Sequence, residues 1–378
     1  MTKTMINAKI YTGKTVIENG FIRFNEQIEN LDDMSNYQAI DNEEVIDVKG
    51  QILVPGFIDI HSHGGYGADS MDADPKVIDE MTKKMLREGI TSYFPTTMTQ
   101  SDENIENALV GIKEAKTLNP MIQGIHLEGP FVSPEYKGAQ PEEFMRVADA
   151  ETMERWNDLS GGNIRLVTYA PEMGDVSAFE KYCLDNNIVL SAGHTGATYE
   201  QLDASKATHI THLFNGQLGL HHREAGVAGF GLLKDDVTVE MIVDGFHIDP
   251  TMVKLAYKAK GADGIVLITD SMRAKGIPEG ESELGGQKVI VKDKQARLEN
   301  GSLAGSVLTF SDAFKKMIEF SGCSIEEAVK MSSVNQAREF GLDNKGTLEP
   351  NKDADLLIMD DQLNIKQTIL GGNVHEFK

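Results

Sequence analysis

The stretch Val54-Pro55-Gly56-Phe57-Ile58-Asp59-Ile60-His61-Ser62-His63-Gly64-Gly65 joins an apolar run to a His-x-His pair. The run over residues 52–60 predicts a buried strand that ends before the two glycines. Residues two apart in a strand point to the same side. His61 and His63 therefore face one way at the carboxyl end of this strand, as half of a binding site for a transition metal.

Apolar strands alternate with helical stretches from residue 52 onward. The predicted strands are 52–60, 91–97, 121–127, 164–170, 187–192, 208–212, 238–243 and 264–269. Helices are predicted between them, for example at 75–88, 102–118 and 251–260. Eight such units predict an α/β fold, a metal-dependent (β/α)8 barrel of the TIM type, which needs about 250 residues.

Both ends of the 378-residue chain have β-like patterns that do not continue the barrel. Short strands are predicted at 5–11, 15–25, 44–48, 354–359 and 365–370. We expect residues 1–50 and 346–378 to form one small β-sandwich-like domain, and residues 51–345 to form the barrel. The polar, glycine-rich residues 272–304 predict a hairpin near the barrel mouth, followed by helices at 309–320 and 324–340.

Polar side chains follow five of the predicted strands, at the end where the active sites of such barrels lie. They are His61 and His63 after strand one, Glu128 after strand three, His194 after strand five, His212 after strand six and Asp270 after strand eight. A set of imidazoles and carboxylates without thiolate suits Zn(II), Fe(II), Co(II) or Mn(II), and Glu128 can bind one metal or bridge two. His126 and His209 are expected to pack beside this site rather than to bind metal.

Composition and charge exclude several classes of protein. The formal net charge of -23 argues against binding to nucleic acid or to an anionic membrane. No apolar run of about 18 residues predicts a transmembrane helix, and the N-terminus lacks the pattern of a signal peptide. Two cysteines cannot build a disulfide framework, which fits a reducing compartment. We therefore expect a cytoplasmic protein.

The histidines of strands one, five and six, with the aspartate of strand eight, resemble the pattern of the amidohydrolase superfamily. The chain also contains the motifs Pro55-Gly56-Phe57-Ile58-Asp59, His126-Leu127-Glu128-Gly129-Pro130-Phe131, Ala192-Gly193-His194, Thr211-His212-Leu213-Phe214-Asn215, Asp244-Gly245-Phe246-His247 and Leu303-Ala304-Gly305-Ser306. Through these motifs it resembles the N-acetylglucosamine-6-phosphate deacetylases within that superfamily. The resemblance implies hydrolysis of N-acetylglucosamine 6-phosphate to glucosamine 6-phosphate and acetate, in amino sugar catabolism and recycling.

The same resemblance implies roles for individual residues. Glu128, His194 and His212 are expected to hold the principal metal, and His61 and His63 allow a second, so one or two divalent ions are expected per subunit. The implied substrate contacts are the Ala139 backbone, Asn215, Gly216, Arg223 and His247, with Leu303, Ala304 and Gly305 lining the pocket. The resemblance also implies a homodimer in which the partner subunit contributes to the sugar-phosphate site.

Asp270 and Arg223 suggest how such a substrate is cleaved and bound. Asp270 is placed to accept a proton from water and hand it to the departing amine, which leaves poorly unless protonated. Arg223, in Leu220-His221-His222-Arg223-Glu224, can fork onto a 6-phosphate, with help from His222. Residues 217–222 depart from the forms expected for the family, so phosphate geometry and sugar preference are left open.

Two alternative functions are weighed against this one. The first is another amidohydrolase, such as an N-acetylgalactosamine-6-phosphate deacetylase, a dihydroorotase-like ring hydrolase or an acyl-amino-acid deacylase. Glu128 stands where many ring hydrolases use a modified lysine, and Arg223 suggests an anionic substrate, so ring hydrolysis is disfavoured. The second is a non-catalytic scaffold. That alternative is disfavoured because such a protein would be expected to lose ligands, whereas all six site residues are present.

Overall fold

Eight short, almost wholly buried strands form the centre of the larger part of the molecule in this computed structural model, which describes residues 2–377. They are β6 (Phe57–Ser62), β9 (Ile90–Pro95), β10 (Ile125–Glu128), β11 (Ile164–Tyr169), β12 (Val189–Ala192), β13 (His209–Ile210), β14 (Thr238–Ile242) and β15 (Ile265–Ile268). β10 to β15 pair in parallel and in chain order, as do β6 and β9. The amide of Thr97 donates to the His126 carbonyl, and that of Asp270 to the His61 carbonyl, so the ring closes. The predicted barrel is confirmed.

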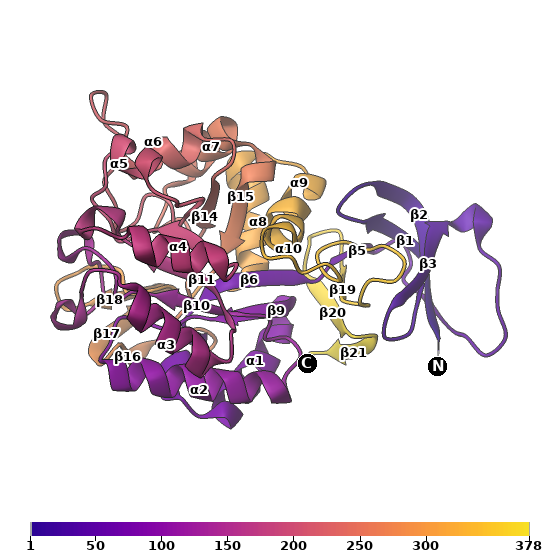
Figure 1. The fold of residues 1–378 in the computed structure, drawn as a ribbon. Helices are drawn as coiled ribbons and strands as arrows, with labels where there is room; N and C mark the ends of the chain where they lie inside the picture. The colour runs from indigo at the N-terminus through magenta and orange to yellow at the C-terminus, as the bar shows by residue number, and fades with distance from the viewer. Residues whose placement is uncertain (1, 378) are drawn as a thin grey trace.

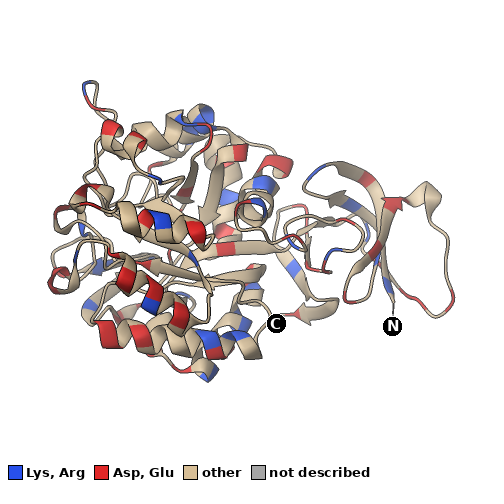
Figure 2. Cartoon of the chain, in the orientation of Figure 1, with Lys and Arg blue, Asp and Glu red and all other residues tan. Residues whose placement is uncertain are grey.

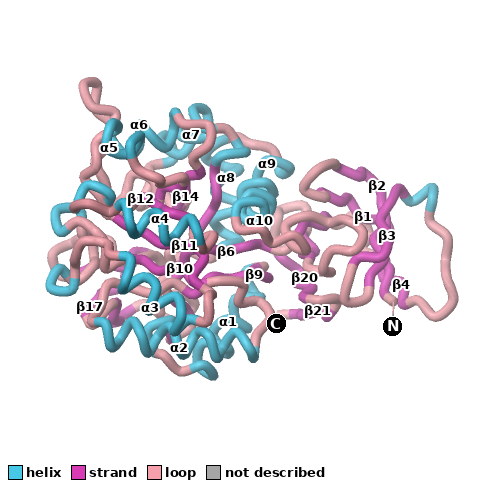
Figure 3. The backbone as a smooth tube through the Cα atoms, viewed as in Figure 1, coloured by secondary structure: helices cyan, strands magenta, loops and turns pink. Residues whose placement is uncertain are grey.

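One helix follows each barrel strand and packs outside it (Figures 1 and 3). These helices are α1 (Pro75–Met85), α2 (Asp102–Leu118), α3 (Ala150–Ser160), α4 (Ser177–Asp185), α5 (Tyr199–Ala204), α6 (Gly226–Leu233), α7 (Pro250–Lys260) and α8 (Phe310–Ser321). Several begin at a side chain that accepts a backbone N–H of the first turn, as Ser101, Asp149 and Thr309 do. The predicted helix at 102–118 has the same bounds as α2.

The last helical segment contains a π-helical turn. It consists of α9 (Ile325–Val329), the turn Lys330–Val334 and α10 (Asn335–Glu339), where one helix was predicted over 324–340. The predicted start is confirmed: Ser324 accepts from the Glu327 amide, and the Glu327 carboxylate accepts from the Ser324 amide. Polar side chains inside this segment bind the barrel wall, since Asn335 donates to the Ile265 carbonyl.

The apolar run 52–60 is two strands rather than the single strand predicted. β5 (Ile52–Pro55) pairs with strands of the terminal domain, whereas β6 begins the barrel. Gly56 lies between them, and a Cβ there would approach Thr91 Oγ1 to 2.1 Å. Hydrophobicity alone could not reveal the break, because both strands are buried and only their pairing partners differ.

Both chain ends form one eight-stranded sheet beside the barrel (Figure 1). Its strands, apart from β5, are β1 (Lys3–Tyr11), β2 (Val16–Phe24), β3 (Ile28–Asp33), β4 (Glu44–Asp47), β19 (Leu356–Met359), β20 (Ile365–Leu370) and β21 (Asn373–Glu376). β3 and β21 were not predicted. The sheet has a core of its own, which includes Ile10, Phe24, Leu53 and Ile358. A small β domain built from both termini is therefore confirmed.

The predicted insertion is a small antiparallel sheet. It consists of β16 (Gly280–Leu284), β17 (Gln287–Lys292) and β18 (Gln295–Leu298), and two very short strands, β7 (Gly64–Gly65) and β8 (Ala68–Asp69), follow β6. Leu284 and Val289 of the insertion pack with Met98 and Met272 at the barrel end. The insertion thus stands at the barrel mouth.

The acidic residues are distributed over both parts of the molecule. Figure 2 shows acidic residues spread over the helices around the barrel and over the β domain rather than gathered in one region. Within residues 2–377, each helix is too short or too polar to span a membrane.

Candidate active site

The predicted metal ligands meet at the carboxyl ends of the barrel strands. His61 lies in β6 and His63 follows it, Glu128 ends β10, and His194 and His212 come shortly after β12 and β13. His194 and His212 have φ angles of 49° and 30°, in the left-handed region that non-glycine residues rarely adopt. Such conformations concentrate at functional sites, where the surrounding structure holds them. Here His194 and His212 both follow strand ends, and their side chains point toward the same place as those of the other predicted ligands.

Glu128, His194 and His212 form a tight triangle of ligand atoms. The Nε2 atoms of His194 and His212 each lie 3.1 Å from Glu128 Oε1 and 3.1 Å from one another. A metal with bonds of about 2.0–2.2 Å to three adjacent ligands holds them about 3.0–3.5 Å apart. The spacing therefore fits a single divalent transition metal.

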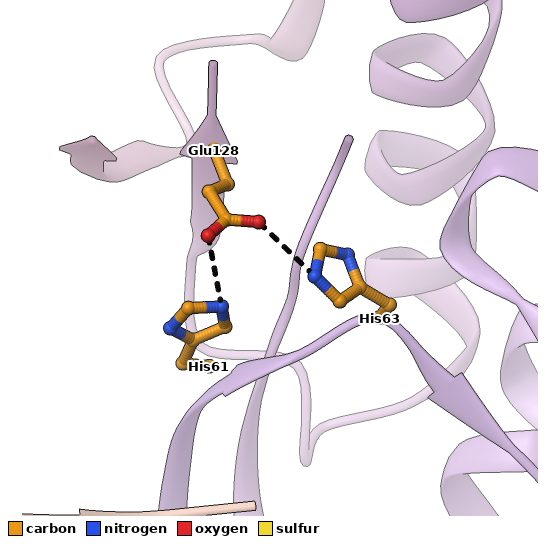
Figure 4. A group of neighbouring side chains, drawn as sticks. All are labelled: His61, His63 and Glu128. Atoms are coloured by element: carbon orange, nitrogen blue, oxygen red, sulfur yellow. Dashed lines mark ion pairs between the residues drawn. The ribbon is translucent and has the colours of Figure 1, made fainter. Parts of the chain in front are cut away.

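His61 and His63 approach the same carboxylate from another side (Figure 4). His63 Nε2 lies 3.1 Å from Glu128 Oε2, and His61 Nε2 lies 3.6 Å from Glu128 Oε1. The ligand atoms of these three residues all lie within 4.8 Å of one another. Glu128 is shared by both groups of histidines, so it is the residue that can bridge two positions.

Hydrogen bonds on the far side of two rings fix which nitrogen faces the centre. His61 Nδ1 lies 2.8 Å from a carboxylate oxygen of Glu240, and His194 Nδ1 lies 3.0 Å from the Tyr136 carbonyl. Because both partners are acceptors, both Nδ1 atoms carry the proton. In the neutral rings the lone pairs are then on Nε2, the form in which imidazole binds a metal. His61 Nε2 is buried without a hydrogen-bond partner among the described residues.

Asp270 lies next to both strand-one histidines. Its Oδ1 is 3.4 Å from His63 Nε2 and 3.6 Å from His61 Nε2. The carboxylate is largely buried, but it lines the cavity at the barrel mouth. Burial would raise the pKa of Asp270, but the charge on His61 and the hydrogen bond from His63 outweigh it and lower the pKa. An ionised carboxylate at this position can accept a proton.

The carboxylates and imidazoles of the site shift one another's pKa values. Burial would raise the pKa of Glu128, but the charge on His61 and the bonds from His194 and His212 hold it well below its usual range. Burial would lower the pKa of His63, but bonds to Asp270 and Glu128 raise it to about 10. The buried negative charge thus attracts positive charge to this point, which is also what favours a divalent cation there.

A cavity of about 380 Å³ opens above the cluster. Six of the predicted substrate contacts line it: Ala139, Asn215, Gly216, His247, Leu303 and Gly305. Ala304 is buried behind the lining. His222 and Arg223 lie elsewhere, on an exposed hairpin between α5 and α6. The cavity also contacts Leu284 and Arg297 of the insertion.

Two glycines permit close packing around the centre. Gly216 has a φ of 55°, and a Cβ there would approach His194 Nδ1 to 2.7 Å. Gly305 has a φ of 60°, and a Cβ there would lie 3.1 Å from the Asp270 carbonyl oxygen. The amide of Ser306 donates to that same carbonyl. The segment 303–306 is thereby fixed directly beside Asp270.

Three residues at the site were not predicted from the sequence. Gln140 donates to Glu128 Oε2 at 2.7 Å, Glu240 binds His61, and Arg297 lines the cavity. Glu240 had a usable signal, because it is a charged residue within an otherwise apolar strand, Thr-Val-Glu-Met-Ile. Gln140 lies in a connecting segment and Arg297 in β18 of the insertion, and neither has a distinguishing pattern.

The two histidines expected to pack beside the site do so. His126 Nε2 lies 2.7 Å from the Thr168 hydroxyl, and its ring meets the His61 ring edge-on with centroids 4.4 Å apart. Burial and the nearby charge of His61 hold the pKa of His126 well below its ordinary value. His209 lies between the carboxylates of Glu240 and Glu339. Its pKa is raised to about 10: burial opposes the shift, and the charge of Glu339 is its main cause.

A (β/α)8 barrel with two groups of histidines, a glutamate that both groups share and an aspartate at its mouth defines a metal-dependent hydrolase as the class of this protein. A profile of the amidohydrolase family matches residues 52–375. The chain is 42% identical over 375 residues to N-acetylglucosamine-6-phosphate deacetylase of Bacillus subtilis (strain 168), covering 97% of this chain and 95% of that protein. It therefore belongs to the amidohydrolase family, and within it to the N-acetylglucosamine-6-phosphate deacetylase group.

Two further similarities bear on structure and substrate. A crystal structure of N-acetylglucosamine-6-phosphate deacetylase from Thermotoga maritima superposes with a TM-score of 0.89 at 37% identity, covering 99% of this chain and 100% of that one. N-acetylgalactosamine-6-phosphate deacetylase of Escherichia coli O157:H7 is 35% identical over 334 residues, covering 86% of this chain and 88% of that protein. Both sugar epimers thus occur among the relatives.

Proposed function

We propose that this chain hydrolyses the N-acetyl group of N-acetylglucosamine 6-phosphate to give glucosamine 6-phosphate and acetate, in amino sugar catabolism and recycling. The observation that carries the proposal is the cluster in which Glu128 joins two groups of histidines, with Asp270 beside it and a cavity above. The relatives with the higher identity, named as deacetylases of this sugar phosphate, support the substrate.

Two metal positions are proposed within this cluster. Oε1 of Glu128 contacts His194 and His212 and lies 3.6 Å from His61 Nε2, and Oε2 contacts His63, so this one carboxylate reaches both groups of histidines. The ligand set suits Zn, Fe, Co or Mn, and we leave the choice to measurement. When bound, such a metal makes hydroxide available near neutral pH and polarises a carbonyl.

Asp270 is the proposed general base and acid. Its carboxylate accepts the proton of the attacking water and then gives it to the nitrogen of the departing amine. Amide cleavage needs this second transfer, because an unprotonated amine is a poor leaving group. This role is supported by the position of Asp270, which lies beside His63 and lines the cavity.

The sugar is proposed to lie in the cavity against the 215–216 turn and the 303–305 segment. His247 lines the same cavity, and its Nδ1 contacts Asp244 Oδ2 at 2.6 Å. Asp244 also accepts from the amides of Phe246 and His247, so it fixes both the loop and the ring. Within residues 2–377 the other ring nitrogen of His247 and the side-chain oxygen of Asn215 have no protein partner and are proposed to bind the substrate, whereas Asn215 Nδ2 donates to the Leu213 carbonyl at 3.2 Å.

The phosphate is proposed to be bound by Arg223 and His222 of a second copy of the chain, in a homodimer. Both residues are exposed on a hairpin that projects from the barrel and does not line the cavity of its own subunit (Figure 1). Leu220 on the same hairpin is 57% exposed. Within residues 2–377 the Arg223 guanidinium has no ion-pair or hydrogen-bond partner, so it is available to an anion. An exposed leucine beside an unpaired arginine suits a contact between subunits.

The cellular location is proposed to be the cytoplasm. Cys183 and Cys323 are both buried and unpaired. Free thiols persist in a reducing compartment. The proposed sugar phosphate is also a charged substrate that does not cross membranes unaided.

Acetate release by the purified protein tests the proposed function. We expect release from N-acetylglucosamine 6-phosphate, loss of release after chelation, recovery with at least one single metal, and little release from unphosphorylated N-acetylglucosamine. The galacto epimer should be run in parallel, because a relative acts on it. Faster release from that epimer would reverse the sugar assignment, and no release from either with any metal would refute the substrate class.

A further inference from the structure

Glu240 is a buried carboxylate that the proposed reaction does not use. It lies in β14, in the middle of the barrel wall, and its side chain is inaccessible to solvent. It does not line the cavity, so it touches neither substrate nor water there. Burying an ionised side chain without partners costs free energy. The residues that are paired with Glu240 therefore indicate what it does.

One oxygen of Glu240 is bound to both groups of ligands. Oε2 accepts from His61 Nδ1 at 2.8 Å and from the backbone amide of His212 at 3.0 Å. His61 belongs to the group with His63, and His212 belongs to the group with His194. A single atom therefore fixes the ring of one ligand and the main chain of another, across the centre.

The other oxygen of Glu240 faces a countercharge. Oε1 lies 3.2 Å from His209 Nε2, and His209 Nδ1 lies 2.8 Å from Glu339 Oε1. Glu339 lies at the end of α10 and lines a separate surface pocket with Thr208 and Arg338. A row of alternating carboxylates and imidazoles thus runs from the metal ligands to the outside of the barrel, and holds Glu240 in place.

The two ligands depend on Glu240 to different degrees. Glu240 orients the His61 ring and, by accepting from Nδ1, keeps the proton on that nitrogen, which leaves the Nε2 lone pair toward Glu128. His212 is held by Glu240 through the backbone only, and the strand β13 before it supplies further support. Loss of the carboxylate should therefore free the His61 ring more than it displaces His212. Glu240 also groups with His61 and His126, but its bond to His61 gives it a supporting role rather than a third metal position.

We propose that Glu240 is a positioning residue that orients His61 and ties it to His212, and so sets the metal affinity of the position formed by His61, His63 and Glu128. The inference rests on the proposed metal cluster but not on the identity of the sugar. Outer partners of metal-bound histidines typically change metal affinity by about 10- to 100-fold when they are lost.

Metal binding by Glu240→Gln tests this role. The apo-protein is titrated with Co(II) or Zn(II) at buffered free concentrations, and bound metal is counted by elemental analysis and by Co(II) absorption. We expect the wild type to bind two equivalents, and Glu240→Gln to bind the second about 10- to 100-fold more weakly while the first changes less. Excess metal should restore turnover, which would not follow from a purely structural role.

A matched control separates positioning from stability. Glu180 is also a buried glutamate of the barrel, where it accepts from the Tyr169 hydroxyl and the Lys206 amide, far from any ligand. Glu180→Gln should lower stability and leave both metal affinities unchanged. Where Glu240→Gln yields no folded protein, Glu240→Asp, which keeps the charge but withdraws it by one methylene, should give an intermediate affinity.

Three results would overturn the inference. They are unchanged metal affinities in folded Glu240→Gln, a wild type that binds one equivalent, and failure of both Glu240 variants to fold while Glu180→Gln folds. Metal titration needs no substrate. Failure to release acetate would therefore reject the sugar assignment and leave the role of Glu240 standing.

Discussion

The barrel mouth and the terminal β domain each contain a glutamate whose side chain is hardly accessible to solvent, and the surroundings of the two side chains differ. The side chains of Glu128 and Glu43 are both 2% exposed. Glu43 accepts from the Tyr37 hydroxyl at 2.7 Å, the Ile40 amide at 3.0 Å and Arg23 Nε at 3.1 Å, and also from the Thr4 hydroxyl. Each of its oxygens is paired with donors of the protein itself.

Glu128 accepts one hydrogen bond from Gln140 but is otherwise surrounded by imidazoles, two of which use a proton elsewhere. Because His61 and His194 donate from Nδ1 to Glu240 and Tyr136, their neutral rings turn lone pairs toward the Glu128 oxygens. Lone pairs facing one another need a proton or a cation between them. A buried carboxylate whose partners are donors stabilises the fold, whereas one whose partners are acceptors indicates a binding site.

The largest effect is expected from Glu128→Gln. This substitution removes the charge that both groups of histidines share, so both metal positions should weaken. We expect metal affinity to fall by more than about 100-fold, because even the loss of an outer partner costs about 10- to 100-fold. Acetate release should fall to background. Elemental analysis checks the metal, with Glu180→Gln as the control. Full metal content in Glu128→Gln would contradict the assignment of Glu128 as a ligand.

Asp270→Asn tests whether Asp270 transfers the proton without being needed to bind the metal. Asparagine keeps the shape of the side chain but cannot accept the proton of the attacking water. Turnover should fall by about 10²- to 10⁴-fold, the usual contribution of a general acid–base group. Metal content should remain near that of the wild type, and KM should change little. Near-normal turnover would remove Asp270 from the proton-transfer role.

Arg223→Ala tests whether an exposed cation without a protein partner belongs to a binding site. Arg223 has no partner within residues 2–377, so we expect its role in binding rather than in stability. A charge-assisted hydrogen bond is worth about 1.5–3 kcal/mol, so KM for the phosphorylated sugar should rise about 10- to 100-fold with little change in melting temperature. Arg297→Ala is the matched comparison, because Arg297 lines the cavity of its own subunit.

A mixed dimer shows which subunit supplies Arg223. When Arg223→Ala and Asp270→Asn subunits are combined, one of the two sites has an intact Asp270 and receives the intact hairpin of its partner. Activity at low substrate concentration should then exceed the sum of the two separate variants. No recovery in verified mixed dimers, together with a larger KM effect of Arg297→Ala, would place the phosphate contact within one subunit.

The sequence was enough to predict that the proposed metal ligands gather at one place, because their positions follow from strand order. Eight alternating units fix where strands end, and side chains that follow parallel strands must gather at one end of the barrel. That is why residues as far apart as His61 and Asp270 could be grouped. The same reasoning placed the insertion over the mouth.

The remaining features depend on contacts that have no local pattern. Glu240 stands out as a charge in β14, but its contact with His61 of β6, two strands away around the barrel, has no local pattern. The break at Gly56 was hidden because β5 and β6 are both apolar and differ only in their sheet partners. Arg223 was predicted to contact substrate, but its hairpin projects into solvent, and its position relative to a cavity depends on a second subunit.

The smallest effect is expected from Glu43→Gln, which should change stability and not activity. Burial would raise the pKa of Glu43, but the bonds from Thr4, Tyr37, the Ile40 amide and Arg23 outweigh it and lower the pKa to about 2 from an ordinary value of 4.5. The substitution removes the ion pair with Arg23 and should lower the free energy of unfolding by about 1–2 kcal/mol at pH 7. Glu44→Gln, at an exposed position of β4, should change it by less than about 0.5 kcal/mol.

The pH dependence of the difference in unfolding free energy between the wild type and Glu43→Gln gives the sharper test. As pH falls, the unfolded chain binds a proton at Glu43 near pH 4.5, whereas the folded chain resists until about pH 2. The stabilisation is therefore complete above about pH 5 and is lost progressively between pH 4.5 and 2. Denaturant unfolding of the wild type and Glu43→Gln at pH 7, 5 and 4 should show two curves that converge toward acid. Curves that stay parallel, or a loss of acetate release at pH 7, would show that burial with protein donors does not by itself mark a structural carboxylate.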